Sequence, residues 1–118
     1  MAVFRTAGRI SRVKSSYVTT LTDPIVLKAG DVITLGPRDT EWPEFVWCTS
    51  AEGKSGWVAD TVFERHGRIG IASRGYNSVE LGATAGEVVT IAEEIGGWSW
   101  CTNEHGESGW VPDTHLSK

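Results

Sequence analysis

The sequence contains one short motif twice. The segment 47–49, Trp-Cys-Thr, recurs at 100–102, and the segment 55–58, Ser-Gly-Trp-Val, recurs at 108–111 with the same spacing of 53 residues. Self-similarity at a fixed spacing is the signature of a structural repeat. A chain of 118 residues can hold two very small domains, so we expect two copies of one small fold.

Further matches lie upstream at larger spacings. Ala29–Val32 matches Ala85–Val88 at a spacing of 56 residues, and Tyr17 matches Tyr76 at a spacing of 59. Each step between these spacings is three residues, which indicates two three-residue insertions in the first copy. Such insertions are tolerated in surface loops.

The repeat predicts two domains, residues 1–65 (repeat 1) and residues 66–118 (repeat 2). The only candidate linker between them is the segment 65–68, Arg-His-Gly-Arg. A linker this short would hold the two domains close together.

The residue types favour strands over helices. Six Trp and fourteen Gly occur beside many Val, Ile and Thr, and no stretch keeps a helical apolar period for three turns. We therefore expect an all-β protein. The predicted strands are 32–35, 46–49 and 56–59 in repeat 1 and 88–92, 98–102 and 109–111 in repeat 2. Alternation along these strands places Cys48 and Cys101 on the core faces of their sheets.

Composition excludes several classes of function. The net charge of −4 opposes a nucleic-acid partner, which normally requires a basic face, and mildly favours a cationic one. The first ten residues include Arg5 and no long apolar run, so we expect neither an export signal nor a membrane span, and a cytoplasmic location. Cys48 and Cys101 lack the spacing of a metal site, and no catalytic constellation stands out. We expect no enzyme activity, no metal and no cofactor.

Repeat 2 resembles the Src homology 3 (SH3) family over residues 70–118. The segments that carry the resemblance are Ala72–Tyr76, Glu80-Leu81, Gly86-Glu87, Trp98, Gly109–Pro112 and His115. The doubled Trp-Cys-Thr motif looks like that of small bacterial tandem proteins labelled variant or ligand-binding SH3 proteins. The resemblance implies two tandem SH3-like β-barrels, which we expect to pack together with a pseudo-twofold relation.

The resemblance also implies a binding surface on repeat 2 for an extended peptide. Flat rings grip a polyproline II segment because it is extended, already ordered and free of internal hydrogen bonds. Acidic residues in flanking loops would pair with a Lys or Arg of a Pro-containing ligand. The predicted peptide-binding residues are Tyr76, Trp98, Pro112, His115, Glu80, Glu93 and Glu94. They could instead close the barrel as core and solvated loop residues.

Repeat 1 departs from this pattern. Ala59 replaces the Pro, Val62 replaces the Tyr, and either Phe45 or Trp42 stands in for the first Trp. We therefore expect repeat 2 to bind and repeat 1 to support it.

Four further tryptophans fall on the faces opposite the two cysteines. Large rings outside a barrel core need a partner, and the simplest partner is the other repeat. We expect an interdomain interface formed by Trp47, Trp57, Trp100 and Trp110. The alternative is that each pair of rings only caps its own sheet.

Two other functions stay open. In a structural or assembly protein, the loop 37–43 of repeat 1, with its two Pro and one Arg, would fill the surface around Trp98. A cell-wall or glycan-binding role is the third reading, and the lack of an expected export signal counts against it.

Overall fold

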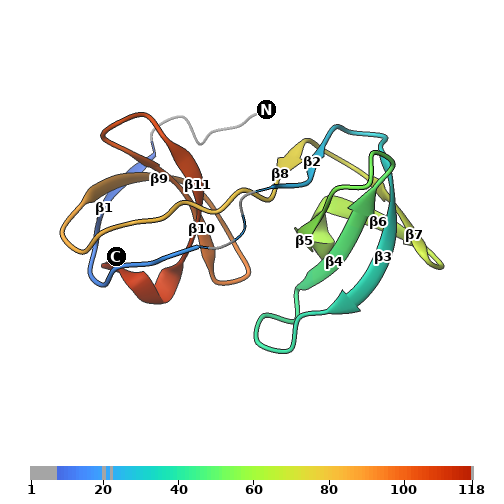
Figure 1. Ribbon diagram of the computed structural model, residues 1–118, viewed down its shortest axis with the longest axis horizontal. Coiled ribbons are helices and arrows are strands. Elements are labelled where there is room, and N and C mark those ends of the chain that lie inside the picture. The colour runs from blue at the N-terminus through green and yellow to red at the C-terminus, as the bar shows by residue number, and fades with distance from the viewer. Residues whose placement is uncertain (1–7, 20, 22, 118) are drawn as a thin grey trace. The chain divides into compact units, whose positions relative to one another are not determined.

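The computed structural model describes residues 8–19, 21 and 23–117, and the chain divides into two compact units. Residues 23–78 form one unit, which we call the inserted unit. Residues 1–22 and 79–118 form the other, which we call the split unit because the inserted unit interrupts it in sequence. Both consist of strands with short 3-10 turns (Figure 1).

The inserted unit contains a five-stranded antiparallel sheet in the order β5-β4-β3-β7-β6. Its strands are β3 (Val32–Arg38), β4 (Phe45–Ser50), β5 (Ser55–Ala59), β6 (Phe63–His66) and β7 (Ile69–Ala72). A two-stranded sheet, β2 (Val26–Leu27) with β8 (Tyr76–Asn77), completes the unit. The 3-10 turn η1 (Asp60–Val62) links β5 to β6.

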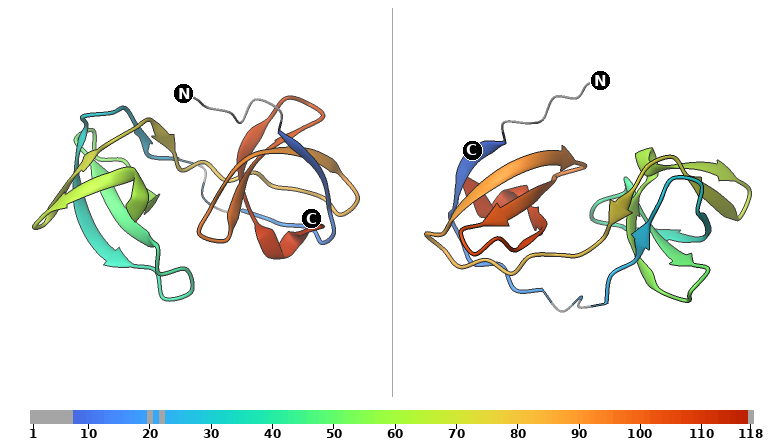
Figure 2. Two further views of the ribbon diagram at one scale, coloured as in Figure 1. Left: turned by 180° about the vertical axis from the view of Figure 1, so that it is seen from behind. Right: turned by 90° about the horizontal axis from the view of Figure 1, so that it is seen from above.

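The split unit has the matching sheet, in the order β11-β10-β9-β1-β12. Its strands are β1 (Arg9–Val13), β9 (Val88–Ile95), β10 (Trp98–Asn103), β11 (Ser108–Pro112) and β12 (Leu116–Ser117), with the 3-10 turn η2 (Asp113–His115) before the last strand. The views in Figure 2 show the N-terminal strand, in blue, among the orange and red C-terminal strands.

Alternation along the strands builds each core. On β4, Val46 and Cys48 are fully buried while Trp47 between them is only half-buried. On β10, Ser99 and Cys101 are fully buried in the same way. The core of the split unit consists of Val13, Leu81, Ala83, Val89, Ile91, Cys101, Val111 and Leu116.

The two sequence repeats exchange their N-terminal strands. β1, from repeat 1, pairs with β9 and β12 of the split unit, whereas β7, from repeat 2, pairs with β3 and β6 of the inserted unit. The register is the same in both units, because Arg12 lies opposite Val88 and Ser117 just as Ile71 lies opposite Val32 and Glu64.

The compact units therefore differ from the consecutive domains 1–65 and 66–118 predicted from the repeat. The reason lies in the segment expected to be a linker. Arg65 and His66 belong to β6, and Gly67, with a φ of 68°, turns the chain back so that His66 lies opposite Ile69. A left-handed backbone suits glycine in a tight turn. The end of repeat 1 and the start of repeat 2 consequently form one hairpin.

The exchanged segments extend beyond the strands. Tyr17 forms an isolated bridge to Ala83 in the split unit, and Tyr76 pairs with Leu27 in the inserted unit. The exchanged segments are thus residues 9–19 and 68–78, taken as far as the structure describes the first of them.

The prediction of an all-β fold is confirmed, and all six predicted strands lie where the sequence placed them. The expected pseudo-twofold packing concerns the placement of the units relative to each other and stays a prediction. Within the described residues, no helix is long and apolar enough to cross a membrane. The expectation of no export signal rests mainly on residues 1–7, which lie outside the described residues.

Candidate functional site: an aromatic shelf on the split unit

Three rings from distant parts of the sequence meet on the split unit. The ring of Tyr17 contacts the ring of Trp98 edge to face, with centroids 5.9 Å apart, and the ring of His115 with centroids 5.2 Å apart. All three side chains are half-buried. Pro112 lies opposite Trp98 on the neighbouring strand and is buried. We call Tyr17, Trp98, Pro112 and His115 the shelf.

Glu80 holds Tyr17 in place. The Tyr17 hydroxyl donates a hydrogen bond to Glu80 Oε1 over 2.5 Å, and the Thr19 hydroxyl donates to the same oxygen over 2.9 Å. Burial, the hydrogen bond to Glu80 and the charge of Glu80 all raise the pKa of Tyr17 above its ordinary value. Tyr17 therefore stays neutral at physiological pH and serves as a donor to Glu80.

His115 is tied to the same exchanged segment. It ends the turn η2, and its Nδ1 lies 3.0 Å from the Ser15 hydroxyl and 3.1 Å from the Ser15 carbonyl oxygen. Its main chain also accepts a hydrogen bond from the Lys14 N–H over 2.8 Å. The orientation of the ring against Tyr17 is thus fixed by main-chain and side-chain contacts.

The two other predicted acidic residues lie on a strand and not in flanking loops. Glu93 and Glu94 belong to β9, opposite Trp100 and Ser99 of β10. The Glu94 carboxylate forms an exposed ion pair with Arg9, at a distance of 2.5 Å from Oε2 to Nη2. The predicted loop position of these two residues was wrong because the predicted strand ended at residue 92, whereas β9 continues beyond its apolar part to Ile95.

Tyr76 belongs to the inserted unit, and Tyr17 occupies the place predicted for it. The Tyr76 ring is buried, and its hydroxyl donates to the Trp57 carbonyl oxygen over 3.3 Å. Of the predicted shelf residues, the structure thus brings together Trp98, Pro112, His115 and Glu80.

Sequence reasoning missed Tyr17, Ser15 and Thr19 as site residues. The signal was present, because Tyr17 aligns with Tyr76 across the repeat. The repeat shows which residues are equivalent, but it does not show which of two equivalent segments pairs with which unit.

The equivalent surface of the inserted unit is closed. Phe45 lies opposite Ala59 as Trp98 lies opposite Pro112, so Phe45 and not Trp42 stands in for the Trp. The side chains of Phe45, Ala59, Val62 and Tyr76 are all at most 8% exposed. The inserted unit thus has core residues where the split unit has its shelf.

The loop 37–43 is anchored within the inserted unit. Arg38 Nη1 donates to Asp60 Oδ2 over 2.8 Å and to the Pro43 carbonyl oxygen over 2.7 Å. The Asp60 N–H donates to the carbonyl oxygen of Glu44, over 2.8 Å. These contacts fasten the loop to the turn η1 of its own unit.

The four remaining tryptophans form one pair in each unit. Trp47 contacts Trp57 edge to face with centroids 4.9 Å apart, and Trp100 contacts Trp110 with centroids 5.4 Å apart. Each pair joins neighbouring strands of its own sheet. Their predicted role in an interdomain interface stays a prediction.

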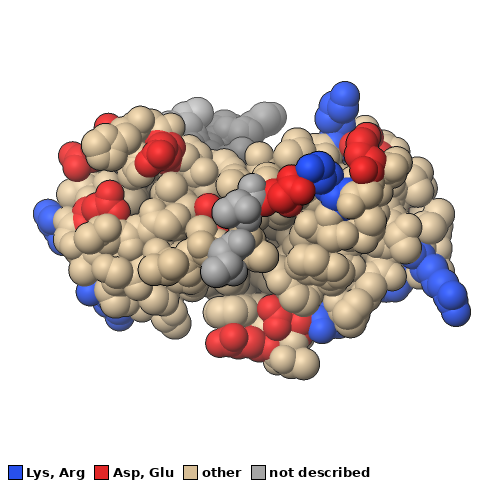
Figure 3. Space-filling view, viewed as in Figure 1, with Lys and Arg blue, Asp and Glu red and all other residues tan. Residues whose placement is uncertain are grey.

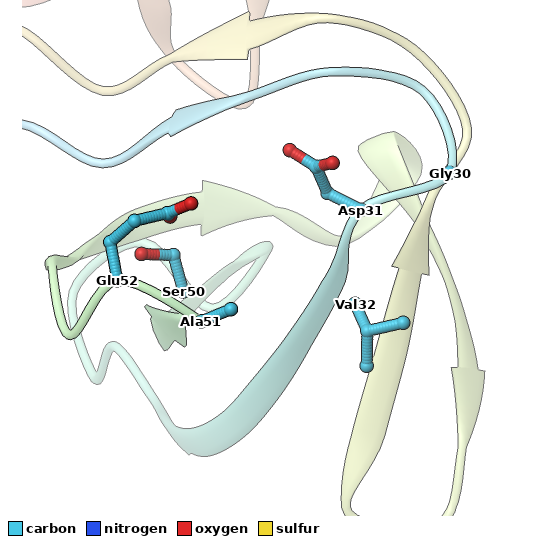
Figure 4. A pocket seen from close by; sticks show the side chains of 6 residues that line it. All are labelled: Gly30, Asp31, Val32, Ser50, Ala51 and Glu52. Atoms are coloured by element: carbon cyan, nitrogen blue, oxygen red, sulfur yellow. The ribbon is translucent and has the colours of Figure 1, made fainter.

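A pocket of about 300 Å³ lies elsewhere, on the inserted unit (Figure 4). It lies between the start of β3 and the turn after β4, and Gly30, Asp31, Val32, Ser50, Ala51 and Glu52 line it. Its walls combine the polar side chains of Asp31, Ser50 and Glu52 with the small apolar side chains of Val32 and Ala51, and no aromatic ring lines it. Nothing in this lining indicates a ligand.

Among the described residues, neither the face shown in Figure 3 nor the two thiols indicates a further site. On the face shown in Figure 3, acidic and basic side chains are interspersed on both units. Neither Cys48 nor Cys101 forms a disulfide, and both side chains are fully buried, as the alternation predicted. Burial raises the pKa of the Cys48 thiol to about 12, so this thiol stays protonated at physiological pH.

Comparison with known families agrees with this geometry. The model of the variant SH3 domain matches the chain over residues 10–63 and again over residues 71–118. Searches of curated proteins and of solved structures give no significant match. SH3-like domains are in general binding modules for protein or peptide segments. The chain belongs to the variant SH3 domain family, of which it contains two copies.

Proposed function

We propose that the protein is a non-catalytic binding module whose shelf on the split unit takes an extended, Pro-containing peptide segment of another protein. The observation that carries the proposal is the set of three half-buried rings in which Tyr17 contacts both Trp98 and His115. A polyproline II segment loses little entropy on binding such rings.

Hydrogen bonds anchor two of the three rings of the shelf. Tyr17 is held by Glu80, and His115 is held by Ser15, so the cost of ordering these two rings on binding is reduced. The carboxylate of Glu80 has hydroxyl groups as its hydrogen-bond donors, and these leave its negative charge in place. This charge favours a ligand with Lys or Arg beside its prolines.

The experiment is a titration of the full chain into labelled 12-residue peptides, followed by fluorescence anisotropy. One peptide carries Pro in a repeating polyproline II pattern with Lys or Arg at one end, a second has the Pro replaced by Ala, and a third has the basic residues replaced by Glu. We expect binding of the first peptide with a dissociation constant on the order of micromolar, as for short extended ligands.

The variant Trp98→Ala should weaken this binding about 30-fold, the effect of losing a central aromatic contact worth about 2 kcal/mol. The matched control is Trp42→Ala, which also removes a half-buried tryptophan but lies on the loop of the inserted unit. It should leave the affinity unchanged. Equal affinity of Trp98→Ala and the parent chain, or no difference between the Pro and Ala peptides, would refute the proposal.

A further inference from the structure

The two exchanged segments are similar enough for the backbone of either to fit either unit. Arg9-Ile10 recurs as Arg68-Ile69, and both segments pair with their neighbours in the same register. Main-chain hydrogen bonds are therefore equivalent in the two pairings. The side chains must select between them.

The side chains that enter the two cores differ in size. β7 contributes Gly70 and Ala72 to the inserted unit, where Ala72 lies opposite Phe63. β1 contributes Ser11 and Val13 to the split unit. There, Val13 lies opposite Leu116, the counterpart of Phe63. The large Phe63 ring thus packs against the segment with the small residues Gly70 and Ala72. The smaller Leu116 packs against the segment with the larger residues Ser11 and Val13.

The fit at Gly70 is tight. A Cβ atom there would lie 2.8 Å from Phe63 Cδ1 and 3.1 Å from Leu35 Cδ2, and the Phe63 ring is itself buried. In the split unit, the equivalent Ser11 is accommodated, and its hydroxyl donates to the Ser117 carbonyl oxygen.

The consecutive arrangement, in which each repeat keeps its own first strand, would mismatch both cores. Ser11 and Val13 against Phe63 would overpack one unit, whereas Gly70 and Ala72 against Leu116 would leave a void in the other. Overpacking and cavities both destabilise a core.

We propose that this match of side-chain sizes decides which N-terminal segment closes which unit, and that it thereby places Tyr17 rather than Tyr76 on the shelf. The second part rests on the proposed function. Ser15 and Thr19 arrive with Tyr17, whereas the other segment would bring Arg74 and Ser78 to the same positions. The positioning residues of the binding site thus include core residues that touch no ligand.

Engineered disulfides in the full chain report which pairing is present. Arg12, Ser117 and Glu64 are exposed, and opposite residues on antiparallel strands are close enough for a disulfide. The pair Arg12→Cys with Ser117→Cys reports the exchanged arrangement, and the pair Arg12→Cys with Glu64→Cys reports the consecutive one. The native Cys48 and Cys101 are buried and do not compete. In the parent chain only the first pair should oxidise to an intrachain crosslink, as read by mass spectrometry.

Reversing the sizes should reverse the result. The segment variant carries Ser11→Gly, Val13→Ala, Gly70→Ser and Ala72→Val. The acceptor variant carries Phe63→Leu and Leu116→Phe. In either variant the crosslink should move from the 12–117 pair to the 12–64 pair. With both sets of changes combined, the sizes match again, and the 12–117 crosslink should return.

A folded segment variant or acceptor variant that still crosslinks 12 to 117 at the parent yield would overturn the proposal. If either variant unfolds, the thermal midpoints are compared instead. The combined variant should melt at a higher temperature than the segment variant and the acceptor variant. A midpoint no higher than those of the two variants would also overturn the proposal. None of these readouts uses a ligand. Failure of the size match is therefore distinguishable from failure of the proposed peptide site.

Discussion

The split unit and the inserted unit share their strand order and register but use one surface in opposite ways. In the split unit, Tyr17, Trp98 and His115 are half-buried rings that form a shelf. In the inserted unit, the equivalent positions hold Tyr76, Phe45 and Val62, all buried. A few residue differences on the same strand framework therefore distinguish a half-buried aromatic surface from core.

Equivalent aspartates show how the change is stabilised. Asp113 accepts a hydrogen bond from the buried Ser99 over 2.6 Å within the split unit. Asp60, its counterpart, instead forms the ion pair with Arg38 of the longer loop. The equivalent aspartate therefore binds a strand residue in the split unit and a residue of the longer loop in the inserted unit.

The largest expected difference between the units concerns the paired positions of Phe45 and Trp98. Phe45→Ala empties a buried site and should lower the free energy of unfolding by about 3 to 5 kcal/mol. Trp98→Ala removes a half-buried ring and should cost less than about 2 kcal/mol, because part of its surface is already hydrated. Urea titration followed by circular dichroism measures both. Equal losses in the free energy of unfolding would show that Trp98 is a core residue, as Phe45 is, and that the two units do not differ at this position.

A smaller difference is expected at two equivalent glycines. A Cβ at Gly109 would lie 2.7 Å from the backbone nitrogen of Leu81, whereas one at Gly56 would meet side chains only, at 2.6 Å from the Ser78 hydroxyl oxygen and 2.8 Å from Ile25 Cγ2. Side chains can move aside and backbone cannot, so Gly109→Ala should cost roughly 3 kcal/mol and Gly56→Ala roughly 1 kcal/mol. Thermal unfolding of the two variants tests this order. The reverse order would contradict it.

The smallest difference concerns the two exchanged tyrosines. Tyr17 donates to a carboxylate, whereas the Tyr76 hydroxyl donates to a main-chain oxygen over 3.3 Å. Hydrogen bonds to charged groups contribute more than neutral ones, so Tyr17→Phe should cost about 1 to 2 kcal/mol and Tyr76→Phe less than about 1 kcal/mol. The Tyr17→Phe variant should also weaken peptide binding by loosening the ring. Indistinguishable urea midpoints for the two variants would contradict the inference that Glu80 anchors Tyr17.

Much of the fold could be predicted from the sequence, because the relevant signals are local. Alternation and turn residues located six strands, and the doubled motif established that two equivalent sheets exist. The proximity of Trp98, Pro112, His115 and Glu80 could also be predicted, because these residues lie in one continuous stretch of repeat 2. The family match over 10–63 and 71–118 follows the same linear order.

The exchange could not be predicted in this way, because it depends on contacts between segments far apart in sequence. β1 and β7 lie at equivalent positions of the repeat, and in our proposal the sizes of Phe63 and Leu116 distinguish the two sites. The glycine in the supposed linker was the one local hint, since Gly67 permits a tight hairpin that joins the repeats. Tyr17 was not predicted as a site residue because it reaches the shelf only through this exchange of distant segments.

The interruption of the split unit has a consequence for synthesis on the ribosome. The inserted unit is continuous, so it can close as soon as residue 78 has emerged, and domains generally fold in the order in which they are made. The first strand of the chain, by contrast, has no partner until β9 and β12 have been translated. β1 therefore stays without these partners while residues 14–87 are translated, and the shelf can form only after the inserted unit has been made.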